Sequence, residues 1–328
     1  MISLLIEIRE GQIKDITYEM LTLAHKLAAA QKQEITSIIL SDNCQQYADT
    51  IKQYSHKIIC VEDPLLANFN TQVYLPVLSN IINDTKPNLF LIASSGFGTD
   101  LAPYLAASLN LPLITDIFDL ELNPDNMLAR RSMYGGKINA DIISKSLPAI
   151  ATVRVGSFEK ILASNLLIPN LSAEITKLPF LIDPSILEMS KFIEYGEVPT
   201  TGIDITKSDI LIAVGRGIKE QKNLAAVEKF AQDIGGTLAC TRPIIDAGWL
   251  PKDRQVGSSG KTVKPKLYIA LGISGAFQHI SGMKSSENII AVNKDPEAPI
   301  FSVAHYGVVG DLLKILPLLA NRINALKG

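Results

Sequence analysis

The residues of this chain that could do chemistry gather around one strand-to-helix turn. Residues Lys266–Ile273 (KLYIALGI) are short, apolar and partly β-branched, which predicts a buried strand. The strand runs directly into Ser274-Gly275-Ala276, and a short helix is predicted from Phe277 onward. Such a turn leaves backbone N–H groups unpaired at the carboxyl end of the strand, where the helix dipole favours anions. The turn is therefore predicted to bind phosphate.

Hydrogen-bond donors outnumber acids in the segments near this turn. A set of this kind suits an anionic ligand that also forms hydrogen bonds. The set consists of Arg242, Ser258, Ser259, Lys261, Gln278, His279, Asn293 and Asp311.

Two arginines follow strand-like segments, and each has a functional and a structural interpretation. Gly215-Arg216-Gly217 follows Asp209–Val214, but the third glycine and the downstream acid of a dinucleotide fingerprint are missing. Pro243 disfavours helical geometry at Arg242, so this arginine is expected to project from an extended segment. On the pattern alone, either side chain could equally be a solvated surface arginine.

Three stretches of this half resemble the C-terminal flavin domain of the electron transfer flavoprotein alpha subunit. They are TRPIIDAGWLPKDRQVG at 241–257, SGKTVKPKLYIALGISGAFQH at 259–279 and IIAVNKDPEAPIFSVAHYGVVGDL at 289–312. The likeness is dense across these stretches and includes NKDPEAPIF almost letter for letter. It implies that this half of the chain holds FAD.

The resemblance also assigns roles to individual residues. It places Arg242 against the flavin ring system, the Ser259 hydroxyl at the N5 edge of the ring, and His279 at its pyrimidine end. At that end of the ring, the Arg242 cation and a hydrogen bond donated by His279 would stabilise negative charge on the flavin. Asp311 and Leu312 match contacts to the adenosine end. In full, the residues expected to bind the cofactor are Arg216, Thr241, Arg242, Val256, Gly257, Ser258, Ser259, Ser274, Gly275, Ala276, Phe277, Gln278, His279, Asn293, Asp311 and Leu312.

Two positions depart from the pattern of the resembled family. Ser258-Ser259 stands where the family more commonly has Gln-Thr, so Ser258 lacks a long amide while Ser259 keeps a hydroxyl. His305 stands where the family usually has Asp. Two positions are open for its imidazole, one beside the flavin site and one at the surface.

Composition places the chain among ordinary globular proteins of two domains. It has 328 residues, of which 47% are hydrophobic and 20% charged, and a net charge of -2. No basic patch or acidic tail is present, which argues against nucleic acid or an anionic membrane as a partner. Cys44, Cys60 and Cys240 are widely spaced and odd in number, so no disulfide framework is expected. With neither a signal peptide nor a ~20-residue apolar run, the protein is expected to be soluble and cytoplasmic.

The first part of the chain alternates strands and helices, which predicts βαβ units and a parallel sheet. After Pro112, four strand-like runs with short turns predict an antiparallel extension, at 114–122, 127–134, 138–144 and 149–155. Ser94–Asp100 is interpreted as a strand-to-helix turn with a Thr/Asp cap rather than a phosphate cradle. Gly135-Gly136 is typical of a hairpin turn, and no ligand is assigned there.

Turn-forming residues between Leu178 and Ile205 mark a boundary between two domains. The fold class is predicted to be α/β, with a nucleotide-hydrolase-like αβ domain at 1–195 and a doubly wound parallel-sheet domain at 196–328. The first is expected to be a partner-binding scaffold and the second to bind FAD.

The resemblance implies that the chain is the FAD-binding alpha subunit of a heterodimeric electron transfer flavoprotein. With a beta subunit as its partner, it would carry electrons from flavin dehydrogenases, such as the acyl-CoA dehydrogenases of fatty acid β-oxidation. The acceptor would be a quinone reductase or a similar oxidoreductase. The sequence shows no acid–base pair, nucleophile triad or metal-ligand cluster, which is typical of an electron carrier whose cofactor does the chemistry.

Two other functions remain open from the residues alone. One is a nucleotide-binding regulatory or scaffold module without redox chemistry. The other is an NAD-dependent dehydrogenase, which the incomplete dinucleotide fingerprint disfavours.

Overall fold

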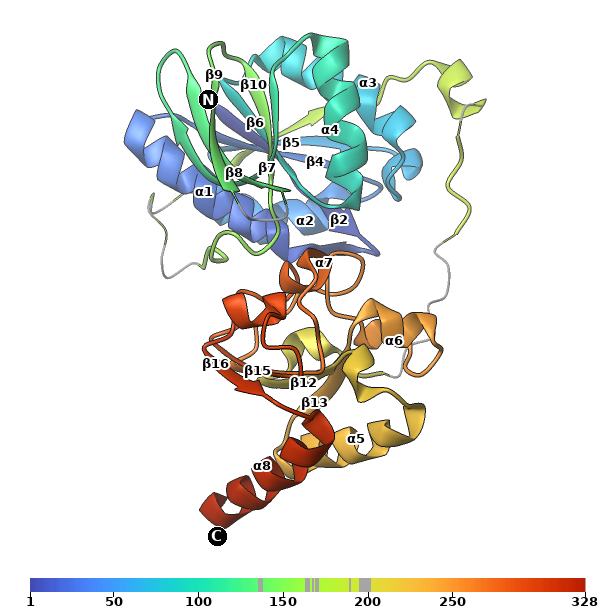
Figure 1. The fold of residues 1–328 in the computed structure, drawn as a ribbon. Coiled ribbons are helices and arrows are strands. Elements are labelled where there is room, and N and C mark those ends of the chain that lie inside the picture. Colours follow the sequence, from blue (N-terminus) through green and yellow to red (C-terminus); the bar gives the residue numbers. More distant parts are fainter. Residues whose placement is uncertain are drawn as a thin grey trace. The chain divides into compact units, whose positions relative to one another are not determined.

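A computed structural model of the chain describes residues 1–134, 138–162, 166, 168, 171–188, 190–194 and 202–327. The chain divides into two compact units, Met1–Glu194 and Tyr195–Gly328 (Figure 1). The predicted domain boundary between 195 and 196 and the predicted Gly135-Gly136 turn both lie outside the described residues. The fold class is α/β, as predicted, because each unit is built on a sheet whose strands are largely parallel.

The first unit is a nine-stranded sheet covered by helices on both faces. Helices α1 (Asp15–Gln31) and α2 (Cys44–Ile51) pack on one face, and α3 (Thr71–Thr85) and α4 (Gly96–Leu109) pack on the other. A small ribbon, β2 (Ile8–Arg9) with β3 (Gln12–Ile13), is separate from the sheet. The strand order is β11 (Glu174–Leu178), β5 (Lys57–Glu62), β4 (Ile35–Ser41), β1 (Ile2–Leu5), β6 (Leu89–Ala93), β10 (Ala149–Val153), β7 (Leu113–Leu122), β8 (Met127–Met133) and β9 (Ile138–Ser144).

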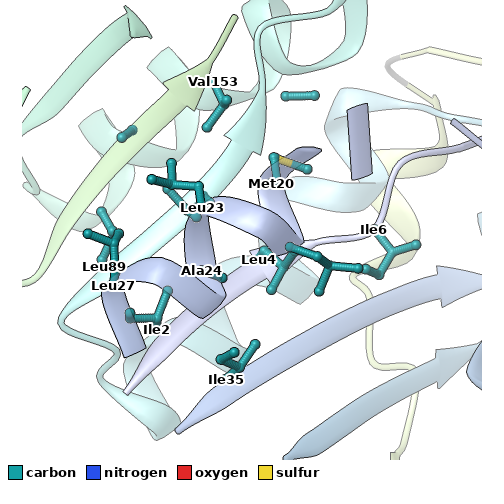
Figure 2. Close-up of a cluster of buried hydrophobic side chains, with 14 of the residues drawn as sticks. Ile2, Leu4, Ile6, Met20, Leu23, Ala24, Leu27, Ile35, Leu89 and Val153 are labelled. Atoms are coloured by element: carbon teal, nitrogen blue, oxygen red, sulfur yellow. The ribbon is translucent and has the colours of Figure 1, made fainter. Parts of the chain in front are cut away.

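The central strands of this sheet are buried on both faces, which explains their nearly continuous apolar sequences. Every residue of β1, β4, β6 and β10 is buried, as expected where helices cover both sides of a parallel sheet. On one face, Ile2 and Leu4 of β1 belong to the same core cluster as Met20, Leu23 and Leu27 of α1 (Figure 2). The spacing of these helical residues gives α1 its apolar side.

The structure corrects the predicted antiparallel extension in one respect. Strands β7, β8 and β9 form it, but β10 lies between β6 and β7 and pairs with both of them in parallel. The reason lies in the sequence of β10, AIATV, whose apolar run without polar alternation suits a strand buried on both faces. Strand β11, which was not predicted, extends the opposite edge of the sheet beside β5.

The second unit is a five-stranded sheet in which every pair of strands is parallel. Helices α5 (Leu224–Asp233), α6 (Arg242–Asp246) and α8 (Leu312–Lys327) pack on one face, and α7 (Phe277–Ile280) packs with loops on the other. After β12 the chain forms β13 on one side of β12 and then β14 on its other side. This reversal creates a topological switch point, where ligands commonly bind. The order is β13 (Thr237–Cys240), β12 (Ile210–Val214), β14 (Leu267–Leu271), β15 (Asn288–Asn293) and β16 (Tyr306–Val309).

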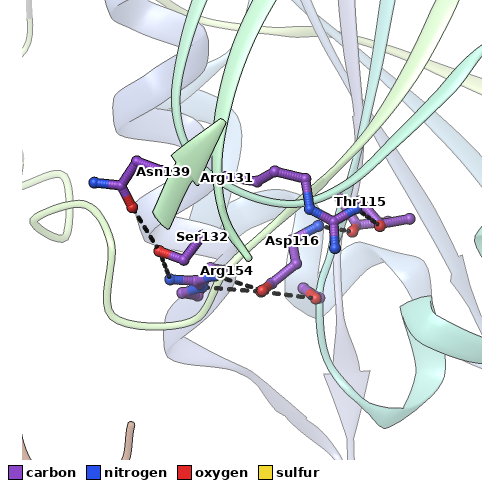
Figure 3. Close-up of polar contacts among 8 residues, drawn as sticks. Thr115, Asp116, Arg131, Ser132, Asn139 and Arg154 are labelled. Carbon is purple, nitrogen blue, oxygen red and sulfur yellow. Dashed lines mark hydrogen bonds and ion pairs between the residues drawn. The ribbon is translucent and has the colours of Figure 1, made fainter. Parts of the chain in front are cut away.

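In the first unit, an ion pair stabilises Asp116 of β7, close to the point where the pairing register of this strand shifts. Arg154 donates from Nε and Nη2 to the two carboxylate oxygens of Asp116, at 3.0 and 2.5 Å, and from Nη1 to Ser132 Oγ at 3.2 Å (Figure 3). Asp116 has a φ of 58°, and its N–H donates to Thr152 Oγ1 at 2.8 Å. A left-handed backbone is unfavourable for a residue other than glycine, so these contacts are what hold Asp116 there.

We expect Arg154→Ala to lower the free energy of unfolding of the first unit by about 1–3 kcal/mol, because Asp116 loses its charged partner. Urea denaturation of the full chain measures this. The matched control is Arg130→Ala, since Arg130 pairs with Asp141 through two hydrogen bonds, at 2.6 and 3.0 Å. Both of these side chains are exposed, so a much smaller loss is expected. Equal losses for the two variants would contradict this account.

Candidate functional site

A pocket of about 540 Å³ lies at the carboxyl ends of β12 and β14, the switch point of the second unit. Its volume is within the usual range for small-molecule sites. Among the described residues, none that lines it is acidic. Of the predicted site residues, all but Gly275, Phe277, Asp311 and Leu312 line the pocket. The lining residues that sequence reasoning missed are Gly215, Gly217, Pro243, Gln255, Gly272 and Ile273.

Three of the missed residues are glycines that let two turns touch. A Cβ on Gly217 would lie 2.6 Å from Gly272 Cα, and a Cβ on Gly215 would lie 2.6 Å from the Gly272 carbonyl oxygen. Gly272 itself has a φ of 61°. Only glycine permits this approach. In the sequence, the available signal for Gly215 and Gly217 was the Gly-x-Gly pattern after a predicted buried strand. Without a third glycine, this pattern is weak evidence for a dinucleotide-binding turn.

The pocket carries positive charge and unpaired donors. The backbone N–H groups of Ser274 and Ala276, which line the pocket, have no acceptor among the described residues, and neither has that of Gly275 between them. Arg216 forms no ion pair within the part of the chain that the structure describes. Arg242 forms one, from Nε to Asp246 Oδ2 at 3.5 Å, and both of these side chains are well exposed. The donor set therefore suits a ligand with negative charge, such as a diphosphate.

The structure corrects the predicted geometry of Arg242, which is helical rather than extended. Arg242 is the first residue of α6, and Pro243 is the second. Proline costs no hydrogen bond in the first turn of a helix, because the N–H groups there have no partner within the helix. The extended residue is Thr241, which precedes the helix with φ -89° and ψ 160°.

His279 is buried in the pocket wall, and both of its ring nitrogens are engaged by the protein. Nδ1 lies 3.1 Å from the Val256 carbonyl oxygen, and Nε2 lies 2.9 Å from the Tyr268 hydroxyl. A carbonyl oxygen only accepts, so Nδ1 carries the proton and Nε2 accepts from Tyr268. Burial lowers the pKa of His279 to about 4. The ring is therefore neutral at neutral pH, and the positive side chains lining the pocket are Arg216 and Arg242.

The hydroxyl-rich loop beside His279 is fastened at several points. The Ser258 N–H donates to the Gln278 carbonyl oxygen at 2.7 Å. Gln255 Nε2 donates to Ser259 Oγ at 2.8 Å, so the Ser259 hydroxyl keeps its own proton for a further acceptor. Gly257 has a φ of 137°, and a Cβ there would lie 2.7 Å from the Gln278 carbonyl oxygen.

Asn293, which also lines the pocket, ties the end of β15 to the turn after β14. Its Nδ2 donates to the Ile273 carbonyl oxygen at 2.7 Å, and its Oδ1 accepts from the Asp295 N–H at 3.0 Å. The side chain therefore supports the pocket wall from two sides.

The four predicted residues that do not line the pocket have other surroundings. Gly275 has a φ of 86° and packs so closely against Ile300 that a Cβ would collide with the Ile300 nitrogen. Asp311 Oδ1 accepts from the Leu313 N–H at 3.0 Å at the start of α8, and Lys294 Nζ, 2.8 Å from Asp311 Oδ2, lowers the pKa of this carboxyl. Leu312 is buried in the core. Phe277 is 44% exposed, because α7 is a single turn whose buried residue is His279.

His305, which departs from the family pattern, does not line the pocket. It is exposed, and its Nδ1 accepts from the Ile289 N–H at 2.9 Å, near the amino end of β15. Of the two interpretations left open for His305, the geometry therefore favours the surface position.

In the first unit, the Ser94–Asp100 turn starts a capped helix, as predicted, but the cap is Ser95 rather than the expected Thr or Asp. Ser95 Oγ accepts from the Gly98 N–H at 3.3 Å and donates to Glu7 Oε2 at 2.6 Å. No helix among the described residues has both the length and the apolar character needed to cross a membrane. The described residues also contain no group of three or more His, Cys, Asp or Glu side chains that could hold a metal ion.

Comparison with known proteins identifies the family. Residues 2–180 match the electron transfer flavoprotein domain, and residues 204–284 match the electron transfer flavoprotein FAD-binding domain. The electron transfer flavoprotein subunit alpha of Clostridium acetobutylicum is 35% identical, over 97% of this chain and 95% of its own. The lactate dehydrogenase (NAD(+),ferredoxin) subunit LctC of Acetobacterium woodii is 39% identical, over 96% of this chain and 74% of its own.

A third relative is the acryloyl-CoA reductase electron transfer subunit beta of Anaerotignum propionicum. It is 34% identical, over 97% of this chain and 94% of its own. The matches to both family domains and to relatives of similar length together show that this chain belongs to the alpha-subunit family of electron transfer flavoproteins.

Proposed function

We propose that the chain binds one FAD in the pocket of its second unit and carries electrons between redox partners. The observation that carries the proposal is the pocket at the switch point, with unpaired N–H groups, two arginines and no acid among its described lining residues. Bound FAD would accept and release electrons, which is chemistry that the pocket side chains cannot supply themselves. The match to the FAD-binding family domain supports the same cofactor.

Different pocket residues would bind different parts of the cofactor. The N–H groups of Ser274 and Ala276 would bind the diphosphate, because both line the pocket and lack an acceptor among the described residues. Arg242 would face negative charge on the reduced ring, and the Ser259 hydroxyl would donate to the ring edge. His279 was expected to donate to the flavin ring, but both of its ring nitrogens bond to the protein, so this buried, neutral side chain would instead exclude water beside the flavin ring.

We further propose an obligate heterodimer with a beta subunit. The relatives named as subunits support this proposal. Strand β9 of the first unit also exposes the large apolar side chains Ile138 (54%) and Ile143 (60%), and Tyr134, directly after β8, is 74% exposed, as partner surfaces commonly are. Electrons would come from flavin dehydrogenases such as acyl-CoA dehydrogenases and pass to a quinone reductase or a similar acceptor.

The cofactor is tested by releasing it from the complex co-expressed with the beta subunit. Chromatography after denaturation should give FAD, and Gly217→Ala should remove one FAD per complex, because its Cβ would collide with Gly272. The matched control Gly96→Ala, where a Cβ meets nothing within 4 Å, should retain all of it. Release of FMN, or of no flavin, would contradict the proposal.

The role of Arg242 is tested by spectroelectrochemistry. Arg242→Ala should lower the first reduction potential of the bound flavin by on the order of 30–60 mV, since loss of the cation disfavours added negative charge and solvent screens part of the effect. Arg322→Ala, at an exposed position of α8 outside the pocket lining, is the control and should leave the potential unchanged. An unchanged potential in Arg242→Ala with normal FAD content would exclude Arg242 as the charge partner.

The assembly is tested by producing the chain alone and together with the beta subunit, with light scattering to count subunits. The complex should be a one-to-one heterodimer whose interface buries more than ~1,600 Å². The alternative is a homodimer, the commonest assembly of soluble chains. A stable, flavin-saturated and redox-competent homodimer of this chain alone would refute the heterodimer.

A further inference from the structure

Tyr268 and His279 form a hydrogen-bonded pair that joins the centre of the sheet to the pocket. Tyr268 lies on β14 and has no exposed surface. Its hydroxyl has one partner among the described residues, His279 Nε2 at 2.9 Å. His279 lies on α7, and its Nδ1 donates to Val256 of the hydroxyl-rich loop. Three segments of the pocket wall are therefore linked through one imidazole ring.

The hydrogen bonds of this pair allow only one protonation state of the ring. The Val256 carbonyl keeps a proton on Nδ1, and the Tyr268 hydroxyl gives its own to Nε2. A second proton on Nε2 would turn Tyr268 into the acceptor. Its O–H would then have no acceptor among the described residues, a cost that adds to the burial of a charged ring.

We propose that Tyr268 is a positioning residue of the flavin pocket, whose hydroxyl donates to Nε2 and, together with the Val256 carbonyl, fixes His279 in one orientation and as the neutral Nδ1–H tautomer. The proposal rests on the proposed function, because the pocket matters only if flavin binds there. The Nδ1–H group holds the Val256 carbonyl, and the Ser258 N–H holds α7 in return, at 2.7 Å from the Gln278 carbonyl oxygen. The loop that carries Ser259 is thereby kept against α7.

The other histidines make this tautomer measurable. The chain has four histidines. In His25, Nε2 lies 2.9 Å from a backbone carbonyl oxygen, so Nε2 carries the proton. In His56 and His305, Nδ1 accepts from a backbone N–H, which again places the proton of the neutral ring on Nε2. His279 is thus the one histidine of the four with its proton on Nδ1.

The test uses the full chain with its beta subunit, labelled with ¹⁵N-histidine, and two-bond ¹H–¹⁵N spectra between pH 6 and 8.5. One ring should show the Nδ1–H pattern throughout, and that ring should be the one lost in His279→Gln. In Tyr268→Phe the Nε2 resonance should shift, because Nε2 loses its hydrogen-bond donor. The flavin dissociation constant should rise about three- to tenfold, as expected for one lost hydrogen bond.

The matched control is Tyr306→Phe, because Tyr306 is 66% exposed on β16 of the same unit. It should leave the tautomer and the affinity unchanged. An Nε2–H or charged His279 in the wild type would overturn the proposal, as would an unaltered Nε2 resonance in Tyr268→Phe. If Tyr268→Phe does not fold, the wild-type spectra still decide. A complex without FAD would contradict the proposed function. The same spectra would still report the tautomer of His279.

Discussion

The backbone contact between Gly217 and Gly272 is the constraint on which the second unit depends. Parallel pairing of β12 with β14 brings the turns after both strands to one edge of the sheet, and the missing Cβ atoms let them touch. With a larger residue at either position, the strands could still pair but the turns would separate. Arg216 belongs to one of these turns and Ser274 follows the other. The positions of these two predicted FAD-binding residues therefore depend on this contact.

The electrostatics of the pocket follow from unequal burial of its polar groups. The most deeply buried ionisable side chain in its lining, His279, is neutral, because desolvation opposes its charged form. The charged arginines lie where water can still reach them, with the Arg242 side chain 69% exposed. A site of this kind needs no buried charge while it is without its ligand. Positive charge becomes desolvated only when an anionic group arrives to pair with it.

The sequence predicted alternating strands and helices in the first unit and the strands β12 and β14 in the second, because short, partly β-branched apolar runs favour buried strands. It did not reveal that β10 enters the middle of the sheet, since pairing partners are decided by the whole fold. The list of site residues came from family resemblance, and most of its members line one pocket. The helical start at Arg242 and the two partners of His279 were beyond the sequence, because they depend on contacts between distant segments.

The position of β10 has a consequence for how the first unit comes into existence. Strands β6 and β10 are neighbours in space. Along the chain they are separated by α4 and by the three antiparallel strands β7, β8 and β9. During synthesis, β6 therefore has an open edge until residues 149–153 have left the ribosome, and β7 has no parallel neighbour until the same moment. Distant pairings of this kind slow folding, and an open apolar edge invites pairing with other chains. The edge of β6 is therefore the place where we expect an incompletely synthesised first unit to pair with other chains.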